Sequence, residues 1–218
     1  SNRQIHDLLA QFEQNPRAWT KAPDIIQKSN QIESKILALS ILETCIKTRW
    51  NILPLQSKKG IKGFVESLVV KLSQDGNLKD IGPFLTKLNT VLIEIIKREW
   101  PHNWPGFITQ VVEVSKRSEV VCANNMNLLR LLSEEAFENK SLHLSHRQVD
   151  NFKENLTKEL SKVFELCMFV LKNSSDRRLI ECTLNTLQKF LAIKWIPIPI
   201  VFSSQLIEAL TLKYFNIQ

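Results

Sequence analysis

The fold of this chain can be predicted from one short stretch, Ile96-Lys-Arg-Glu-Trp-Pro-His-Asn-Trp-Pro-Gly-Phe107 (IKREWPHNWPGF). It carries two Trp-Pro pairs four residues apart, with a phenylalanine close behind. Tryptophan is costly to leave in water, and proline is costly inside a helix. The stretch therefore fits a ligand site, an aromatic platform for nucleic acid, or a joint between two helices.

The start of this stretch has a counterpart earlier in the chain. Ile46-Lys-Thr-Arg-Trp50 and Ile96-Lys-Arg-Glu-Trp100 share the pattern IKxxW at an offset of 50 residues, and Ile193-Lys-Trp195 is a looser copy. Helix pairs that recur every forty to fifty residues are typical of HEAT or armadillo repeats, which stack because one pair cannot bury its apolar face alone. We predict an all-α protein, an α-solenoid of HEAT repeats with about ten helices in roughly five pairs. A compact helical bundle is the alternative.

Apolar residues recur at helical spacing in almost every segment between prolines, glycines and polar turns. Pro105 suits the first position of a helix, and Asp176 and Ser145 suit N-cap positions. Helices are expected near residues 2–14, 17–29, 31–49, 58–73, 79–99, 105–116, 119–138, 146–172, 177–194 and 203–216.

The composition favours a binding protein over an enzyme. The 218 residues include only 5 glycines, and the sequence lacks the motifs GxGxxG, GxxxxGK[ST] and GxSxG. Such glycines let a backbone approach phosphates and cofactors, so we expect no cofactor and no catalysis. The net charge of +7 is spread along the chain; it is compatible with acidic partners, but solvated helix faces are the preferred interpretation.

Other residue types give weak signals. The four cysteines are far apart and lie among apolar neighbours, which predicts buried, reduced thiols, although a disulfide pair stays possible. No segment is long and apolar enough to cross a membrane, and no secretory signal is visible. His143 and His146 have metal-ligand spacing on a helix, but lie in an expected loop and cap, so no metal site is predicted. Glu134 and Glu135 point to different helix faces and do not form a catalytic pair.

Two further patterns leave alternatives open. The tryptophans could stack on single-stranded nucleic acid, but their position at helix ends beside prolines favours packing between helices. The run Asn124-Asn-Met-Asn127 fits either the start of a helix or a patch that faces a partner, because asparagine is a poor helix former and a good hydrogen-bonding residue.

Several motifs together resemble one family. Ile46 to Pro54, Glu99 to Phe107, Asn124 to Met126 and Leu132 to Glu135 are similar to the exportin-1 family, the importin-β-type receptors for leucine-rich nuclear export signals. The similarity runs from about Asn15 to Asn216, nearly the whole chain.

The resemblance implies a HEAT solenoid that binds the GTPase Ran in its GTP form through the second helices of its first repeats, at 31–49, 79–99 and 119–138. It also implies contacts with phenylalanine-glycine nucleoporins and shuttling between nucleus and cytoplasm through the nuclear envelope, with no membrane insertion and no direct DNA binding. The expected Ran contacts are exposed positions on those helices: Lys35, Glu43, Lys47, Lys87, Asn89, Thr90, Asn124, Asn125 and Asn127. A related importin-β-type receptor and a nucleic-acid-binding or scaffolding helical repeat are the alternatives.

The resemblance further implies that the chain is one continuous N-terminal fragment of a longer receptor. Residues 13–97 resemble the importin-β N-terminal region, and residues 98–218 resemble the region specific to exportin-1. Cargo with leucine-rich signals is expected to bind regions that this fragment lacks. A structural, inter-repeat role is expected for the aromatic residues at helix ends: Trp50, Trp100, Trp104, Phe107 and Trp195.

Overall fold

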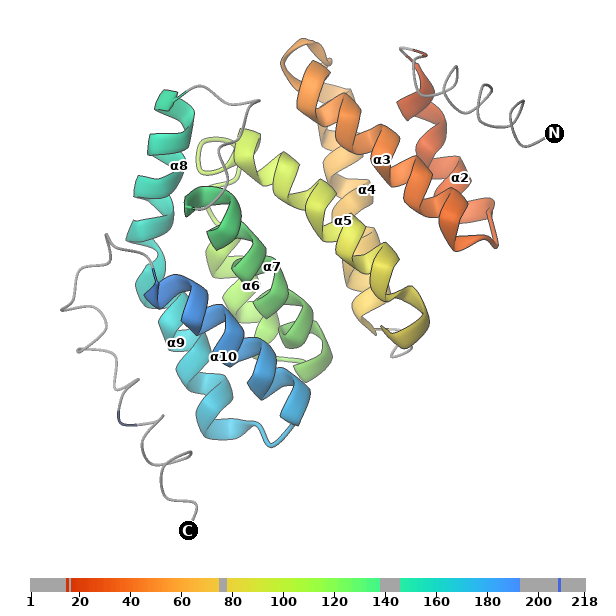
Figure 1. Ribbon diagram of the computed structural model, residues 1–218. Helices are drawn as coiled ribbons and strands as arrows, with labels where there is room; N and C mark the ends of the chain where they lie inside the picture. Colours follow the sequence, from red (N-terminus) through yellow and green to blue (C-terminus); the bar gives the residue numbers. More distant parts are fainter. Residues whose placement is uncertain (1–14, 16, 75–77, 138–145, 193–207, 209–218) are drawn as a thin grey trace. The chain divides into compact units, whose positions relative to one another are not determined.

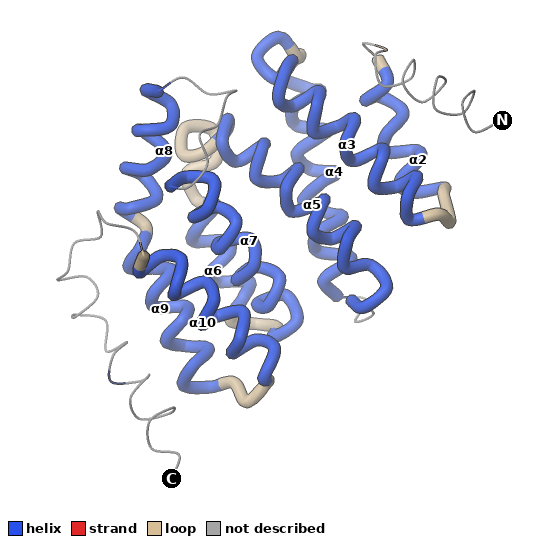
Figure 2. Tube along the Cα trace, in the orientation of Figure 1, coloured by secondary structure: helices blue, strands red, loops and turns tan. Residues whose placement is uncertain are grey.

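The computed structural model describes residues 15, 17–74, 78–137, 146–192 and 208, and the regular elements in this part of the chain are helices (Figures 1 and 2). The chain divides into two compact units, Ser1–Arg98 and Glu99–Gln218. Within each described unit the helices form the consecutive pairs of an all-α, HEAT-type solenoid.

The first unit begins with a 3₁₀ turn, η1 (Ala18–Lys21), which runs into α2 (Ala22–Lys28). The loop after α2 leads to α3 (Ile32–Arg49), and η2 (Trp50–Ile52) turns the chain into α4 (Leu55–Gln74), which is followed by α5 (Leu78–Glu99). Helix α2 packs on α3, and the ion pair between Glu43 and Lys87 joins α3 to α5, which lies beside it (Figure 1).

The second unit shows the repeat arrangement clearly. It contains α6 (Phe107–Ser115), α7 (Glu119–Phe137), α8 (His146–Lys158), α9 (Leu160–Asn173) and α10 (Arg177–Leu191). Helix α6 packs on α7 and α9 packs on α10, while α6 also contacts α9 and α7 contacts α10. The first helices of the two pairs thus form one layer and the second helices form the other (Figure 1).

Most of the predicted helices are confirmed, and the differences occur at their ends. The prediction that Pro105 begins a helix is wrong, because α6 begins at Phe107 with Gly106 as its N-cap residue. The capping role of Asp176 is confirmed, since its carboxylate accepts a hydrogen bond from the Leu179 N–H at 2.7 Å. The expected helices at 2–14 and 203–216 and the Ser145 cap lie outside the described residues.

The prediction of one helix over 146–172 is also wrong. Helix α8 ends at Lys158, and α9 begins at Leu160. Between them, the Glu159 N–H is shared between the carbonyls of Asn155 and Leu156, at 3.3 and 3.2 Å, and its ψ of −1° departs from the helical value. No proline or glycine marks the break, and buried Leu156 and Leu160 keep the helical spacing across it, so periodicity does not reveal it.

The tryptophans at the helix ends are buried. Trp50 is 3% exposed, Trp100 5% and Trp104 8%, and Phe107 is buried beside them, as expected for residues that join helices. The Trp100 ring meets the edge of Phe152 in α8 at 5.5 Å between centroids. The Trp104 ring packs on Phe107 at 4.9 Å, and its indole N–H donates to the Gln110 side chain at 3.1 Å. Trp195 lies outside the described residues.

We expect the substitution Trp104→Ala to lower the free energy of unfolding by about 3–5 kcal/mol, because it truncates a buried aromatic side chain and leaves a cavity. Chemical denaturation followed by circular dichroism measures this loss. Trp104→Phe keeps the ring contact with Phe107 and should lose clearly less. Equal stabilities for wild type and Trp104→Ala would contradict the structural role.

Candidate interaction surfaces

The first unit brings one carboxylate and two lysines together across α3 and α5. Glu43 and Lys47 lie four residues apart on α3, so they share a helix face, and α5 adds Lys87. Both lysine ammonium groups donate hydrogen bonds to the Glu43 carboxylate. Glu43 is buried, whereas the lysine side chains are 30% and 26% exposed. Glu43 therefore fixes both cations at the edge of the surface.

A second carboxylate sits deeper on α5. Glu94 binds Lys97 at 2.8 Å and Arg98 at 2.7 Å, and the exposed fraction of each of these three side chains is 7% or less. Arg98 also donates to the main-chain oxygen of Lys47 at 3.2 Å, so it ties the end of α5 to the last turn of α3. Buried charges of this kind are tolerated only when each is paired and hydrogen-bonded.

These contacts set the protonation of both carboxylates. Burial acts to raise the pKa of Glu43 and of Glu94. The hydrogen bonds and charges of the neighbouring lysines and arginine outweigh burial, so the pKa of each carboxyl lies below its ordinary value of 4.5. Both groups are therefore charged at neutral pH.

The second unit repeats the arrangement on α7 and α10. The Glu134 carboxylate binds Arg130 on α7 at 2.6 Å and Lys189 on α10 at 3.4 Å. Arg130 also donates to the Asn127 side chain at 2.8 Å. Arg130 and Lys189 are about one-third exposed, at 29% and 34%.

All three clusters have the same charge balance. Two cations and one carboxylate give each a net charge of +1 (2 − 1). Lysine and arginine carry more N–H donors than one carboxylate can satisfy. The clusters at Glu43 and Glu134 are partly exposed and place their cations at the surface, and we call them the second-helix clusters.

The predicted contact residues divide into two groups. Lys35, Lys47, Lys87, Thr90 and Asn127 are partly exposed. The expectation of exposure is wrong for the other four, which are buried: Glu43, Asn89, Asn124 and Asn125.

Asn125 is buried because it hydrogen-bonds inside the repeat. The Asn125 amide donates to the Ser115 hydroxyl at 2.9 Å, a bond that ties α7 to α6. Helical spacing alone could not distinguish a polar residue that bonds to a neighbouring helix from one that faces water.

Sequence reasoning missed the contribution of α10. The helix at 177–194 was predicted, but the expected Ran contacts did not include residues of this helix, although it is the second helix of the next pair and lies beside α7. Extending the same repeat logic by one pair would have pointed to Lys189. Arg130 was missed because it lies between apolar leucines, where it reads as an ordinary outward residue.

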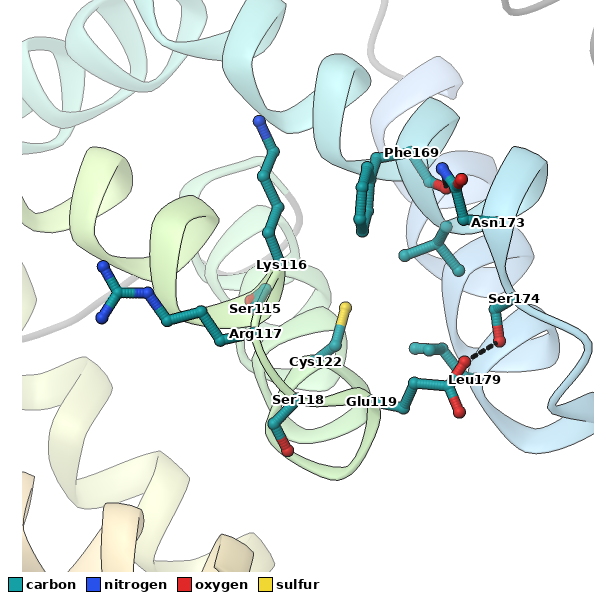
Figure 3. A pocket seen from close by; sticks show the side chains of 11 residues that line it. Ser115, Lys116, Arg117, Ser118, Glu119, Cys122, Phe169, Asn173, Ser174 and Leu179 are labelled. Carbon is teal, nitrogen blue, oxygen red and sulfur yellow. Dashed lines mark hydrogen bonds between the residues drawn. The ribbon is translucent and has the colours of Figure 1, made fainter.

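The second unit also contains a pocket of about 160 Å³ between the α6–α7 turn and the end of α9 (Figure 3). Its floor includes the buried side chains Cys122, Val170 and Leu179, and its wall includes Phe169, which is 37% exposed. The Lys116 ammonium lies 5.9 Å from the centre of the Phe169 ring.

The polar groups at this pocket hold its shape. Ser174 donates to the Glu119 carboxylate at 2.6 Å, the contact drawn in Figure 3, and Lys116 binds Glu165 at 2.7 Å. The Arg117 side chain extends away from Phe169 (Figure 3). The pocket is therefore an apolar hollow whose rim carries both cations and carboxylates.

The four cysteines are free thiols, as predicted, and Cys45, Cys122 and Cys167 are buried, whereas Cys182 is half-buried. Burial raises the pKa of Cys122 to about 11 and raises that of Cys167 further above its ordinary value. A thiol is nucleophilic as the thiolate, so these residues suit packing and not catalysis.

Two other kinds of feature are absent from the described residues. No three His, Cys, Asp or Glu side chains there gather as a possible metal site, and His143 lies outside the described residues. In that same part of the chain, no helix has both the length and the apolarity needed to cross a bilayer.

Stacked helix pairs with charged clusters along their second helices define a HEAT-type helical-repeat protein. Residues 5–71 match the model of the importin-beta N-terminal domain, and residues 82–218 match the model described as exportin 1-like protein. The chain belongs to the exportin 1-like family. The predicted division at residues 97 and 98 stays a prediction.

Relatives from distant organisms agree with this assignment. The chain is 38% identical to exportin-1 of Schizosaccharomyces pombe and 40% identical to exportin-1 of Drosophila melanogaster, each over 99% of this chain and 20% of the relative. It is 36% identical to the protein EXPORTIN 1A of Arabidopsis thaliana, over 96% of this chain and 19% of the relative. The chain spans about a fifth of the length of these relatives.

We expect Glu94→Gln to lower the free energy of unfolding by roughly 3 kcal/mol, because it leaves two buried cations without their carboxylate. Urea denaturation measures the loss. Glu154→Gln removes a carboxylate from an exposed pair with Lys158 and should change stability little, which makes it the matched control. Equal effects of the two substitutions would contradict the structural role of Glu94.

The ion pairs of Glu94 and Glu43 predict that the stability of the first unit depends on pH in the acidic range. Because the folded-state pKa of Glu94 and of Glu43 lies below 4.5, their contribution to stability is complete at neutral pH and is lost as the pH falls from about 4.5 toward the folded-state values. Denaturation midpoints measured across this range should fall more steeply for wild type than for Glu94→Gln. If the midpoints of wild type and Glu94→Gln fell equally steeply with pH, the stabilising role of the Glu94 carboxylate would be contradicted.

Proposed function

We propose that this chain is the Ran-binding part of a nuclear export receptor that moves between nucleus and cytoplasm through the pores of the nuclear envelope. The observation that carries the proposal is the second-helix clusters, which lie on paired helices of a chain in the exportin 1-like family. In the proposed receptor, cargo with leucine-rich export signals binds regions beyond the matched fifth of the relatives.

In this proposal, the partly exposed cations of the second-helix clusters contact Ran-GTP. Lys47 and Lys87 act in the first unit, and Arg130, Lys189 and Asn127 act in the second. Glu43 and Glu134 act indirectly, because they hold these cations in one rotamer and so reduce the entropy lost on binding. Buried Asn89, Asn124 and Asn125 support the helices, and Lys35 and Thr90 remain predicted contacts of the first unit.

Ran-GTP binding would act through linkage and without any chemical step. A solenoid has several curvatures of similar energy, and a ligand that prefers one of them shifts the population toward it. Because coupling is reciprocal, a curvature that favours Ran-GTP and also favours cargo makes each ligand strengthen the binding of the other.

A chimera tests the proposal. In it, this chain replaces the matched fifth of exportin-1 from S. pombe, so that the remaining contacts of a full receptor are present. We expect the chimera to bind Ran-GTP more tightly than Ran-GDP in calorimetric titrations. The double substitution Lys47→Ala and Lys87→Ala should weaken Ran-GTP binding at least tenfold, or by about 1.4 kcal/mol.

Lys58→Ala with Lys59→Ala removes the same charge from the first turns of α4 and serves as the control. Unchanged affinity after the substitutions at Lys47 and Lys87 would reject this contact surface. Equal binding of Ran-GTP and Ran-GDP by the unmodified chimera would reject the proposed function.

We further propose that the pocket beside Phe169 receives a phenylalanine side chain of a phenylalanine-glycine nucleoporin. Its volume of about 160 Å³ and apolar floor suit one aromatic ring, and Phe169 and Lys116 offer edge-to-face and cation–π contacts. A single small pocket gives weak binding, which suits rapid passage.

Nuclear magnetic resonance titration of this chain with a phenylalanine-glycine repeat peptide tests this contact. We expect shifts centred on Phe169 and a several-fold loss of affinity in Phe169→Ala. Val120→Ala, which truncates another exposed apolar side chain of this unit, should bind normally. A peptide with serine in place of phenylalanine should not bind; if it binds equally well, the pocket has another role.

A further inference from the structure

The corner between α3 and α4 exposes two large apolar side chains. Ile52 is 80% exposed and Leu55 is 67% exposed, more than any other large apolar residue in the described part of the chain. Single exposed apolar residues are common on protein surfaces, but two of this size at one turn are a starting point for an interaction site.

The corner is held in place by the fold. Trp50 is buried beneath it, and the Leu53 N–H bonds to the carbonyls of Arg49 and Trp50, both at 3.2 Å. The first full turn of α4 closes with a hydrogen bond from the Lys58 N–H to the Pro54 carbonyl at 3.1 Å. Anchors that are already ordered lose little entropy when a partner binds.

The exposed side of α4 continues from this corner. Lys59, Gly60 and Ser67 are exposed along it, and Val70 near its end is 47% exposed. A Cβ atom added at Gly60 or Gly63 would meet no atom within 4 Å, so nothing in the described chain requires glycine there. Glycine destabilises a helix interior relative to alanine, but it leaves the middle of this face flat.

The charge around this face is mainly positive. Arg49, Lys58, Lys59 and Lys62 follow one another in sequence, and no aspartate or glutamate occurs between Arg49 and Glu66. Farther along α4, Glu66 lies beside Lys62 and Lys71 follows, so residues 49–71 carry five cations and one carboxylate, a net charge of +4 (5 − 1). Such a surface attracts an acidic partner and repels a basic one.

We propose that this surface, the α4 face, binds an acidic amphipathic helix of a partner protein. The α4 face consists of Ile52, Leu55, Lys58, Lys59, Gly63 and Val70. Leu55 and Val70 are 15 residues apart, which spans about 22 Å along α4 and matches four turns of a partner helix.

The parts of the α4 face have separate roles in the proposal. Apolar side chains of the partner cover Ile52 and Leu55 at one end and Val70 at the other. Partner carboxylates meet Lys58 and Lys59, and the flat region at Gly63 lets the two backbones approach closely.

Nucleic acid satisfies only the lysines, because it has no aliphatic side chain to cover Ile52 and Leu55. The inference is independent of Ran binding, which uses other side chains.

The experiment uses this chain and a synthetic helical peptide of about 16 residues. The peptide carries leucines at positions i, i+3, i+4 and i+7 of successive turns, with glutamates on the remaining faces. Fluorescence anisotropy should show saturable binding that weakens about tenfold or more between low and high salt. Ile52→Ser with Leu55→Ser, and separately Lys58→Glu with Lys59→Glu, should each raise Kd at least tenfold.

Gly63→Ala separates binding from folding. It should raise the thermal unfolding midpoint, because alanine favours the helix, and yet raise Kd several-fold, because the added methyl group keeps the partner helix away. Val114→Ser with Val120→Ser removes two exposed apolar residues from the second unit and should leave Kd unchanged.

Four results would overturn the inference. The first is that the peptide shows no saturable binding, and the second is that a peptide with lysines in place of the glutamates binds equally well. The third is that wild type and the Ile52→Ser, Leu55→Ser variant have equal Kd values. The fourth is that Gly63→Ala binds the peptide as tightly as wild type or more tightly. Two further measurements test other occupants of the α4 face: binding of this chain to vesicles that contain anionic lipid, and self-association of this chain in sedimentation velocity. Vesicle binding or self-association that depends on Ile52 and Leu55, without peptide binding, would assign the α4 face to a membrane or to a second copy of this chain instead.

Discussion

The first unit depends on the rule that a buried charge needs a partner. Lys97 and Arg98 lie inside the surface near the end of α5, where the Glu94 carboxylate pairs with both cations and the main-chain oxygens of Glu94 and Lys47 accept hydrogen bonds from Arg98. Satisfying these contacts of Arg98 fixes where the last turn of α5 meets the last turn of α3. A slip of one helical turn would leave a cation unpaired, so the charges specify the register that apolar packing alone leaves loose.

That register has a second effect, at the surface. Once α3 and α5 are aligned, Lys47 and Lys87 reach the same carboxylate from two different helices. The second unit reaches the same result with Arg130 and Lys189 around Glu134. Each carboxylate holds flexible cations in place, so the surface presents fixed donors and still keeps a surplus of positive charge. The α4 face achieves its order differently, through the buried Trp50 and a hydrogen-bonded turn.

The sequence predicted the helices well because their apolar stripes and stop signals are local. The offset of IKxxW identified the repeat, and the burial of Trp50, Trp100 and Trp104 agrees with the expected joints. The site was predicted less well, for two physical reasons. A polar residue such as Asn125 can be buried when a neighbouring helix supplies Ser115 as its partner, and nothing local in sequence reveals that neighbour. The break at Glu159 likewise leaves no local signal, since the apolar spacing passes through it without change.

The buried thiols bear on how such a chain withstands its surroundings. Because burial raises its pKa to about 11, the Cys122 thiol is almost entirely protonated at neutral pH. Oxidants and electrophiles react with the thiolate, so Cys122 and the still more deeply buried Cys167 are shielded by protonation as well as by burial. The repeat core of the second unit therefore offers those reagents almost no thiolate to attack, which makes the fold durable toward thiol chemistry.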